Sequence, residues 1–255
     1  MSHTSRARDT DTRTRTIDAM GMRDRAMNSL LRSMVSEGAS RIRLVNVFGQ
    51  RYIATNLAGR VEIDIEGTPG NDLGAFMDGP TVTVHGNVQD GCGNTMNSGA
   101  IIVHGRAGDI AGLSMRGGSM LIRDDIGYRG AIHMKAYGDQ TPLLVVGGTA
   151  QDFFGEYMAG GTAVLLGLTG KPHRARFIGT GMHGGVIYVR GEVQSYQLGK
   201  EVAVLQPDAE DLALIEEAVS AYAGCFSASA REILSARFVK LSPVSTRPYG
   251  TLYTY

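Results

Sequence analysis

Two histidines, His85 and His104, could serve chemistry because they lie 19 residues apart in equivalent positions of neighbouring segments. Two imidazoles stacked one above the other can bind a metal ion. Glu66 and Arg123 occupy the same position in the segments on either side, and no carboxylate or third histidine joins the pair at a fixed spacing. We therefore favour an outward polar ladder over a metal site.

A second row of polar residues consists of Asn71, Asp90, Asp109 and Asp152. Carboxylates in a row could hold Ca²⁺. Each residue is equally suited to an Asx turn, in which the side chain caps its own backbone N–H groups. No Gly-Gly-x-Gly-x-Asp repeat accompanies the row, so the turn is the favoured interpretation.

A GxGxxG sequence runs from Gly179 to Gly184. In dinucleotide-binding proteins this motif follows a strand and opens a helix whose N-terminus meets the pyrophosphate. Here the next residues, GVIYVRG, predict a strand, so we expect a corner of the chain rather than a phosphate site. No Ser-His-Asp order, Walker loop or HExxH motif occurs in the sequence, which favours a scaffold over an active site.

Composition narrows the class of protein further. Lys plus Arg equals Asp plus Glu, at 25 each, so bulk charge recruits neither nucleic acid nor an anionic membrane. Cys92 and Cys225 form no CxxC pair, which argues against a Cys-ligated zinc or iron–sulfur centre and favours a reducing compartment, by default the cytoplasm. The sequence has no signal-peptide h-region and no run of about 18 apolar residues, so neither secretion nor a membrane span is expected.

The elements that must position these residues repeat every 19 residues. Each short apolar run ends at one slot, which we call the anchor, and the spacings between anchors are 19, 19, 19, 24, 19 and 24 residues. The anchors are Gly67, Gly86, Gly105, Asp124, Gly148, Gly167 and Gly191. Alternate residues before each anchor are apolar, which predicts a strand with one buried face.

Two further slots follow each anchor. The first, seven residues on when an insertion after Gly170 is allowed for, holds Gly74, Gly93, Gly112, Ala131, Gly155 and Gly179. The second, three residues later, holds Met77, Met96, Met115, Met134, Met158 and Met182. A unit with one strand and no helix cannot bury its apolar face alone, but stacked units can. The sequence therefore predicts an all-β solenoid, a right-handed single-stranded parallel β-helix of about seven coils.

Flanking segments are expected to cover the ends of the rod, because an open terminal coil is a bare sheet edge. The expected organisation is a disordered tail over 1–16, an N-terminal capping helix within 17–40, the β-helix over 41–193, and a C-terminal helical cap and tail over 194–255. The apolar stripe of the first helix is predicted to be Ala26, Leu30, Leu31 and Met34. Two helical patterns follow Gly191, the second with a Ser229/Glu232 capping box.

The outward strand positions change character along the rod. Early coils carry Glu62, Asp64, Thr81 and Thr83 there. Later coils carry Leu143, Val145, Val164, Val186 and Tyr188. Exposed, the later set would form an apolar stripe in water, so either the C-terminal helices fold back over it or a partner protein covers it. These five residues are the candidate partner surface.

The segments GRAGDIAGLSMRGG and GTAQDFFGEYMAGG share Gly, Asp, Gly, Met and Gly-Gly in register. This pattern resembles the GXGXG β-helix domain at the C-terminus of the glutamate synthase large subunit, a domain that also occurs in one of the subunits of formylmethanofuran dehydrogenase and of the formyltransferase/hydrolase complex. The resemblance covers about residues 45–193. The phrases GNDLGAFMDG, GNTMN, HMKAYGD and GTGMHGGVIYVRG look most similar to the stand-alone form, in which the large subunit is split into separate polypeptides.

The resemblance implies a non-catalytic structural subunit that holds glutaminase and synthase subunits in place, with ammonia passing between them. It implies FMN and an iron–sulfur cluster in a partner subunit and no cofactor in this chain. The sequence begins Met-Ser where the family's glutaminase part has a Cys nucleophile, so no catalytic, cofactor-binding or metal-binding residue is carried over. A formyl-transfer complex is the alternative assembly, a homo-oligomer is left open, and neither nucleic acid nor a membrane is an expected partner.

Overall fold

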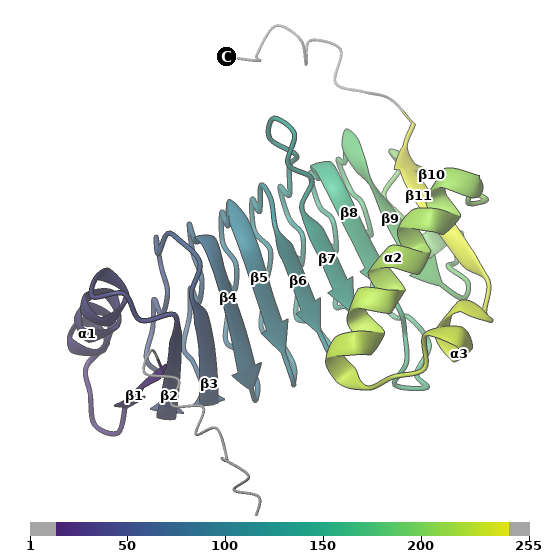
Figure 1. Ribbon diagram of the computed structural model, residues 1–255. Coiled ribbons are helices and arrows are strands. Elements are labelled where there is room, and N and C mark those ends of the chain that lie inside the picture. The colour runs from purple at the N-terminus through teal and green to yellow at the C-terminus, as the bar shows by residue number, and fades with distance from the viewer. Residues whose placement is uncertain (1–13, 245–255) are drawn as a thin grey trace, which may run out of the picture.

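The computed structural model describes residues 14–244 and shows a parallel β-solenoid of about seven turns, as predicted (Figure 1). Its single sheet has the order β1-β2-β3-β4-β5-β6-β7-β8-β9-β11-β10. The strands are β1 (Thr14–Asp18), β2 (Arg41–Phe48), β3 (Glu62–Thr68), β4 (Asp78–His85), β5 (Ser98–Val103), β6 (Ser119–Ile122), β7 (Leu143–Val146), β8 (Ala159–Leu165), β9 (Gly184–Arg190), β10 (Val202–Leu205) and β11 (Phe238–Pro243). The helices are α1 (Asp24–Ser36), α2 (Ala209–Phe226), α3 (Ala230–Leu234) and the 3₁₀ helix η1 (Ser195–Gln197).

Each coil adds its strand to the previous one in the register that the repeat predicts. Ile63 pairs with Val82, and Val82 pairs with Ile101. Isolated bridges from Val88 to Ala107 and onward join the coils on a second side. The inward strand residues and the six methionines of the repeat are buried in one continuous core. Stacking therefore supplies the apolar burial that no single coil could provide.

The third side of each coil is a turn in which every second residue has a positive φ. In one coil these residues are Gly91, Gly93 and Thr95, with φ of 70°, 67° and 53°. The N–H groups of Gly91 and Thr95 donate to the next coil and that of Gly93 donates to the previous coil, so the turns are hydrogen-bonded in a stack. A Cβ on Gly93 would lie 2.1 Å from the methyl carbon of Met120. The recurring glycine slot thus combines a left-handed backbone with an interior position.

At both ends of the sheet the structure has additional strands as well as the helices that were expected to cover the rod. Residues 14–16, expected in the tail, belong to β1, which pairs in parallel with β2. Residues 1–13, the rest of that expected tail, and 245–255 lie outside the described part of the chain. Beyond β9 the sheet continues with β11 and β10, both in antiparallel pairings. These edge strands carry no anchor slot, so the repeat does not reveal them.

Helix α1 lies inside the predicted span, but its buried stripe differs from the predicted one. Met27 and Leu31 are buried, whereas Ala26 and Leu30 are exposed. Both pairs are spaced four residues apart, so helical periodicity alone allows either face. Packing against the first coils selects the face that carries the larger Met27 side chain.

Among the described residues, no helix combines the length and the apolar character needed to cross a membrane.

Candidate functional site

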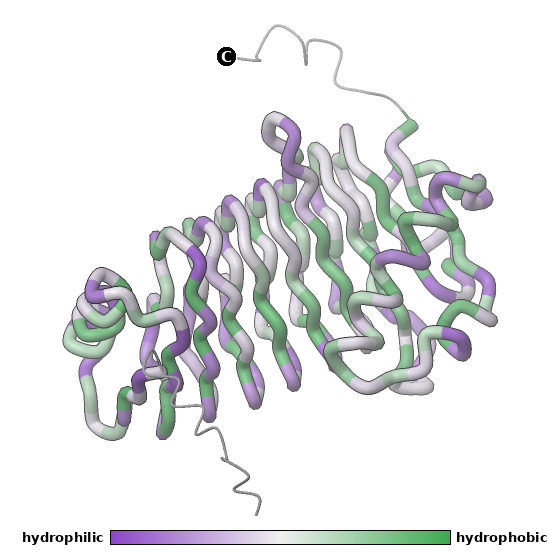
Figure 2. The backbone as a smooth tube through the Cα atoms, in the orientation of Figure 1, coloured by the Kyte–Doolittle hydropathy of each residue, from purple (hydrophilic) through white to green (hydrophobic). Residues whose placement is uncertain are grey.

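The outer face of the sheet has a covered half and an open half. Helices α2 and α3 lie over the later strands (Figure 1), and hydrophobic colour is prominent along the middle and later strands in Figure 2. Val145, Val164 and Tyr188 are fully buried, and Leu143 and Val186 pack partly buried against the same cluster. The chain's own helices therefore cover the candidate partner surface, which corrects the interpretation of these five residues as a site for another protein.

A buried polar network fixes the N-terminal end of α2. The Tyr188 hydroxyl donates to Asp211 Oδ1 at 2.6 Å, and Lys240 Nζ lies 2.8 Å from Asp211 Oδ2. Burial alone would raise the pKa of Asp211, but the hydrogen bonds from Lys240, Tyr188 and the Asp208 backbone outweigh it and hold the pKa below its usual value. The ionised carboxylate thus joins α2 to β9 and β11.

A second contact fixes the C-terminal half of α2. The Tyr222 hydroxyl donates to the Arg123 carbonyl oxygen at 2.9 Å. Burial raises the pKa of Tyr222 to about 12, so the hydroxyl keeps its proton. A Cβ on Gly147 would lie 1.9 Å from this hydroxyl oxygen, so glycine makes room for the contact.

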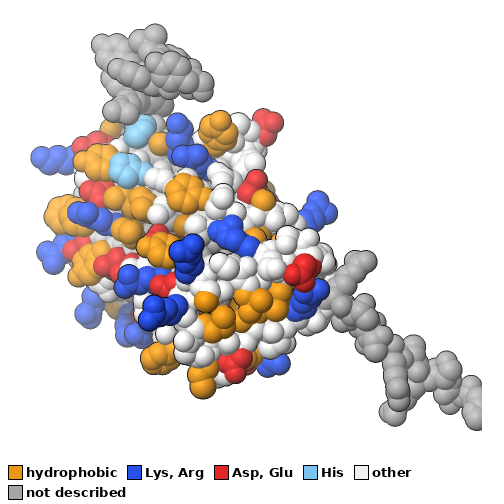
Figure 3. All heavy atoms as spheres, turned by 90° about the vertical axis from the view of Figure 1, so that its left-hand side faces the viewer, with side chains coloured by type: hydrophobic (Ala, Val, Ile, Leu, Met, Phe, Trp, Pro, Cys, Tyr) orange, Lys and Arg blue, Asp and Glu red, His pale blue; other side chains and the backbone are white. Residues whose placement is uncertain are grey.

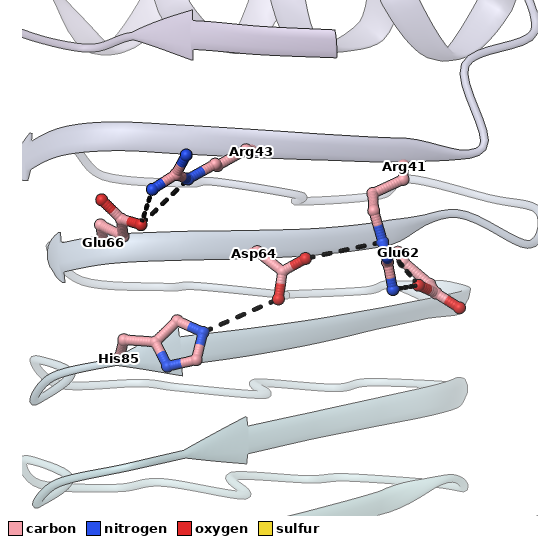
Figure 4. A network of polar contacts seen from close by, with 6 residues as sticks. All are labelled: Arg41, Arg43, Glu62, Asp64, Glu66 and His85. Carbon is pink, nitrogen blue, oxygen red and sulfur yellow. Dashed lines mark hydrogen bonds and ion pairs between the residues drawn. The ribbon is translucent and has the colours of Figure 1, made fainter. Parts of the chain in front are cut away.

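The open half, on β2, β3 and β4, carries a network of charged side chains (Figure 4). Arg41 Nε donates to Glu62 at 2.9 Å and lies 3.8 Å from Asp64. Arg43 Nε donates to Glu66 at 2.9 Å. These pairs join neighbouring strands and are about half exposed, so each contributes little to stability, and together with Asp64 they place two arginines and three carboxylates on this face.

The histidine ladder of the sequence exists and borders this surface. The rings of His85 and His104 stack with centroids 5.2 Å apart, and His104 meets the Phe226 ring edge-on at 5.1 Å. His85 Nε2 lies 3.7 Å from Asp64. Burial, together with the charges of His85 and Arg123, lowers the pKa of His104. The pair links the open face to the end of α2.

The aspartate row hydrogen-bonds between coils rather than within its own turn. Asp90 Oδ1 accepts the Asp109 N–H, and Asp109 Oδ1 accepts the Tyr128 N–H, each at 2.8 Å. Asp152 accepts the Arg176 N–H at 2.8 Å. Each carboxylate caps the residue above it, one coil further on. Within residues 14–244, no group of three or more His, Cys, Asp or Glu side chains could hold a metal ion.

The GxGxxG segment is a solenoid corner, as expected. Gly179 and Gly181 have φ of 68° and 69°, and β9 follows directly from Gly184. The two cysteines lie in different surroundings: Cys92 is buried, with a pKa raised to about 12 by burial, and Cys225 is half-buried. Neither thiol has the environment of a reactive thiolate.

Stacked aromatic rings on the turn side escaped the sequence analysis. Phe153 and Phe177 stack at 4.9 Å, and His133 and Tyr157 stack at 5.3 Å. Arg129 lies over the Phe153 ring at 5.3 Å from its centroid. Each stack joins equivalent positions of successive coils, two residues before or after the glycine slot, so the repeat contained the signal that would have found them.

Fold and surface together define a β-solenoid whose polar groups mostly join one coil to the next. A family model described as the GXGXG motif matches residues 37–244, and the chain belongs to this family. The chain is also similar to "Uncharacterized protein MJ1350" of Methanocaldococcus jannaschii. The two are 47% identical over 249 residues, which cover 93% of this chain and 95% of the relative.

Proposed function

We propose that this chain is a non-catalytic structural subunit of a multi-subunit glutamate synthase, holding its glutaminase and synthase subunits in place. The observation that carries the proposal is the family match over 37–244, which spans the solenoid together with α2, α3 and β11. The motifs that resemble the stand-alone glutamate synthase domain fall within that range. The expected FMN and iron–sulfur cluster belong to a partner subunit, and the expected compartment is the cytoplasm.

The use of the polar side chains supports a structural role. Asp90, Asp109 and Asp152 each accept a backbone N–H of the next coil, and Asp211 anchors α2. His85 and His104 stack on each other beside Asp64. A scaffold needs side chains committed to its own rigidity, whereas an active site keeps polar groups directed at a substrate.

Isolation of the native assembly tests the proposal. The chain, tagged at its own locus, should be recovered with a protein that carries FMN and an iron–sulfur cluster, detected by flavin absorbance and iron content. Supplied with a two-electron reductant, the assembly should form two glutamates from one glutamine and one 2-oxoglutarate. Recovery with proteins of a formyl-transfer system would favour the alternative assembly, and a chain that stays solitary in extract would contradict both.

A double variant tests whether the two histidines of the ladder take part in catalysis or binding. Because they lie in a ladder, His85→Gln with His104→Gln should leave the activity of the assembly unchanged. A loss of activity in an assembly that still forms would instead support an independent catalytic or binding site at this ladder.

A further inference from the structure

A depression of about 790 Å³ lies at the N-terminal end of the rod. It is lined by Met20, Gly21, Met22, Asn46, Val47, Phe48, Gln50, Glu66 and Gly67. Phe48 is 92% exposed and Met20 is 71% exposed. Its volume falls in the range of known binding pockets, and two large apolar side chains stand in water at its rim.

An irregularity in β2 turns Phe48 outward. The pairing of β2 with β3 shifts between Leu44 and Val47, and Asn46 has a φ of 57°. Asn46 Nδ2 donates to Asp18 Oδ1 at 2.9 Å, which holds the bulge. Beyond the bulge, Val47 faces the core and Phe48 faces solvent. Bulges that redirect a side chain are common beside functional sites.

Gln50 completes the wall of the depression from within. Its side chain is buried, donates to the Ala19 carbonyl at 2.8 Å and accepts the Phe48 N–H at 2.6 Å. The loop that carries Met20 is therefore fixed to the end of β2. The depression exists before any partner arrives, so little ordering is required on binding.

The charge at this end is positive. Residues 14–68, from β1 to the end of β3, contain eight arginines, no lysine and six acidic residues. The acidic residues are engaged within the chain: Asp18 binds Asn46, Asp24 accepts the Arg51 N–H, Glu37 pairs with Arg15, Glu62 pairs with Arg41, Asp64 lies 3.8 Å from Arg41, and Glu66, which lines the depression, pairs with Arg43. Figure 3 shows basic side chains among hydrophobic ones on this face. An excess of arginine over lysine beside exposed apolar side chains is typical of protein interfaces.

Several of these arginines, Arg23, Arg25 and Arg51 among them, have no side-chain partner within the described range 14–244. Arg23 is the N-cap residue of α1 and makes no capping hydrogen bond, and Arg25 is in the first turn. Cations are unfavourable at the positive end of a helix. Their placement there therefore does not serve the stability of α1.

We propose that this end of the rod is a docking surface for an acidic segment of a partner protein, with one apolar side chain of that segment seated between Met20 and Phe48. The proposal rests on the proposed function, under which the partner is a glutaminase or synthase subunit. The arginines are complementary to the acidic segment, and the depression supplies the central apolar contact.

Two other occupants fit less well. Nucleic acid would bind mainly through phosphate contacts, and these would leave the apolar depression unfilled. The net charge of the whole chain is also zero. A second copy could offer the acidic face of α2, where Leu212 and Leu214 are exposed. That contact would join two different patches of one chain, and such heterologous contacts form rings or open filaments rather than a bounded complex with other subunits.

The test uses the assembly recovered from cells that carry variants of the full chain. In Arg23→Glu with Arg25→Glu, the new carboxylates suit the start of α1, so the melting temperature should be unchanged or higher. Recovery of the partner should nevertheless fall at least tenfold, and Phe48→Ala should cause a similar loss. The matched control, Arg116→Glu with Arg174→Glu, reverses two exposed arginines elsewhere and should recover the partner normally.

A cross-link identifies the occupant. With p-benzoylphenylalanine in place of Met20, irradiation of the assembly should join the chain to a segment rich in Asp and Glu. Full recovery of a flavin-bearing partner by all variants would overturn the docking surface and leave the proposed function intact. Cross-links to a second copy of the chain, to nucleic acid, or to a basic segment would also overturn it. A partner that depends on the patch but carries neither FMN nor iron would contradict the proposed function alone.

Discussion

The glycine slot on the turn side sets a strict requirement at single residues. Gly93 has a φ of 67°, and an added Cβ would meet the Met120 methyl carbon at 2.1 Å. Gly38, just beyond α1, has a φ of 89° but no atom within 4 Å of an added Cβ. A side chain at Gly38 would meet backbone strain alone, whereas one at Gly93 would meet backbone strain and steric overlap together.

Gly93→Ala should lower the free energy of unfolding by about 2–3 kcal/mol. Left-handed strain contributes about 1–2 kcal/mol, and overpacking contributes about 1 kcal/mol, the low end of its range, because the Met120 methyl carbon ends a flexible side chain. Gly38→Ala should lower it by about 1–2 kcal/mol, because only the strain remains. Urea unfolding followed by circular dichroism measures both. Equal losses at the two positions would show that the interior contact with Met120 contributes nothing.

His104 should make the stability of the protein depend on pH. Its pKa is lowered in the folded chain, mainly by burial, so between the folded and unfolded pKa values the unfolded chain binds more protons. Stability is therefore complete above the unfolded pKa of about 6.5 and is lost as pH falls through the folded pKa. His173, whose pKa burial also lowers, acts in the same direction.

Melting temperatures measured from pH 8 to pH 5 should thus fall for the wild-type chain and fall less for His104→Gln. An identical profile for His104→Gln would show that this imidazole titrates alike in both states.

At the scale of elements, helix α2 is held by few polar contacts over a broad apolar surface. Asp211→Asn removes the charge that pairs with Lys240 under the helix. Breaking a buried pair in this way typically costs about 3–5 kcal/mol. We expect α2 to open before the rod unfolds, because the coils beneath it have their own core.

Proteolysis and binding of a hydrophobic dye test this prediction. The Asp211→Asn chain should be cleaved within 206–244 and should bind the dye, while residues 41–190 stay resistant. Glu210→Gln, one residue away and exposed, should behave as wild type. Global unfolding without a local step would show that α2 and the rod form one cooperative unit.

The sequence predicts the coils because strand, glycine and methionine slots recur in register, and stacking makes each slot a row in space. It does not predict β1, β10 and β11, because each edge strand occurs once and lacks an anchor. It predicts two C-terminal helices but not where they pack, because the apolar outward face of the later strands could be covered equally well by these helices or by another protein. The bulge that exposes Phe48 depends on Asn46 and Asp18, which are 28 residues apart and share no repeat slot.

For the whole molecule, the repeat predicts that coils are interchangeable units. Deleting residues 87–105 removes one 19-residue repeat. It joins Gly86 to Arg106, so the next anchor, Asp124, still follows Gly86 by 19 residues. The shortened chain should remain soluble and rich in β-structure, with a lower melting temperature because one set of neighbour contacts is lost. Deleting 87–110 instead leaves a spacing of 14 residues between the anchors Gly86 and Asp124, five fewer than one coil needs, and should give an insoluble or unfolded chain.

Circular dichroism and solubility after expression compare the two deletions. A folded product from the second would show that the slots do not set the register. If neither deletion gave a folded chain, all seven coils would be needed to form a stable core.

The position of β11 between β9 and β10 has a consequence for synthesis. The strands β2 to β9 can join the sheet in the order in which they leave the ribosome, since each pairs with the strand before it. β10 emerges earlier than β11 but pairs with it, so it waits until residue 243 has been made. Until then β9 is an unpaired edge of the sheet, and the apolar outer face of the later strands is not yet covered by α2 and α3. The nascent chain is thus most prone to misassociate in the interval between residues 190 and 243, when a chaperone would be of most use to it.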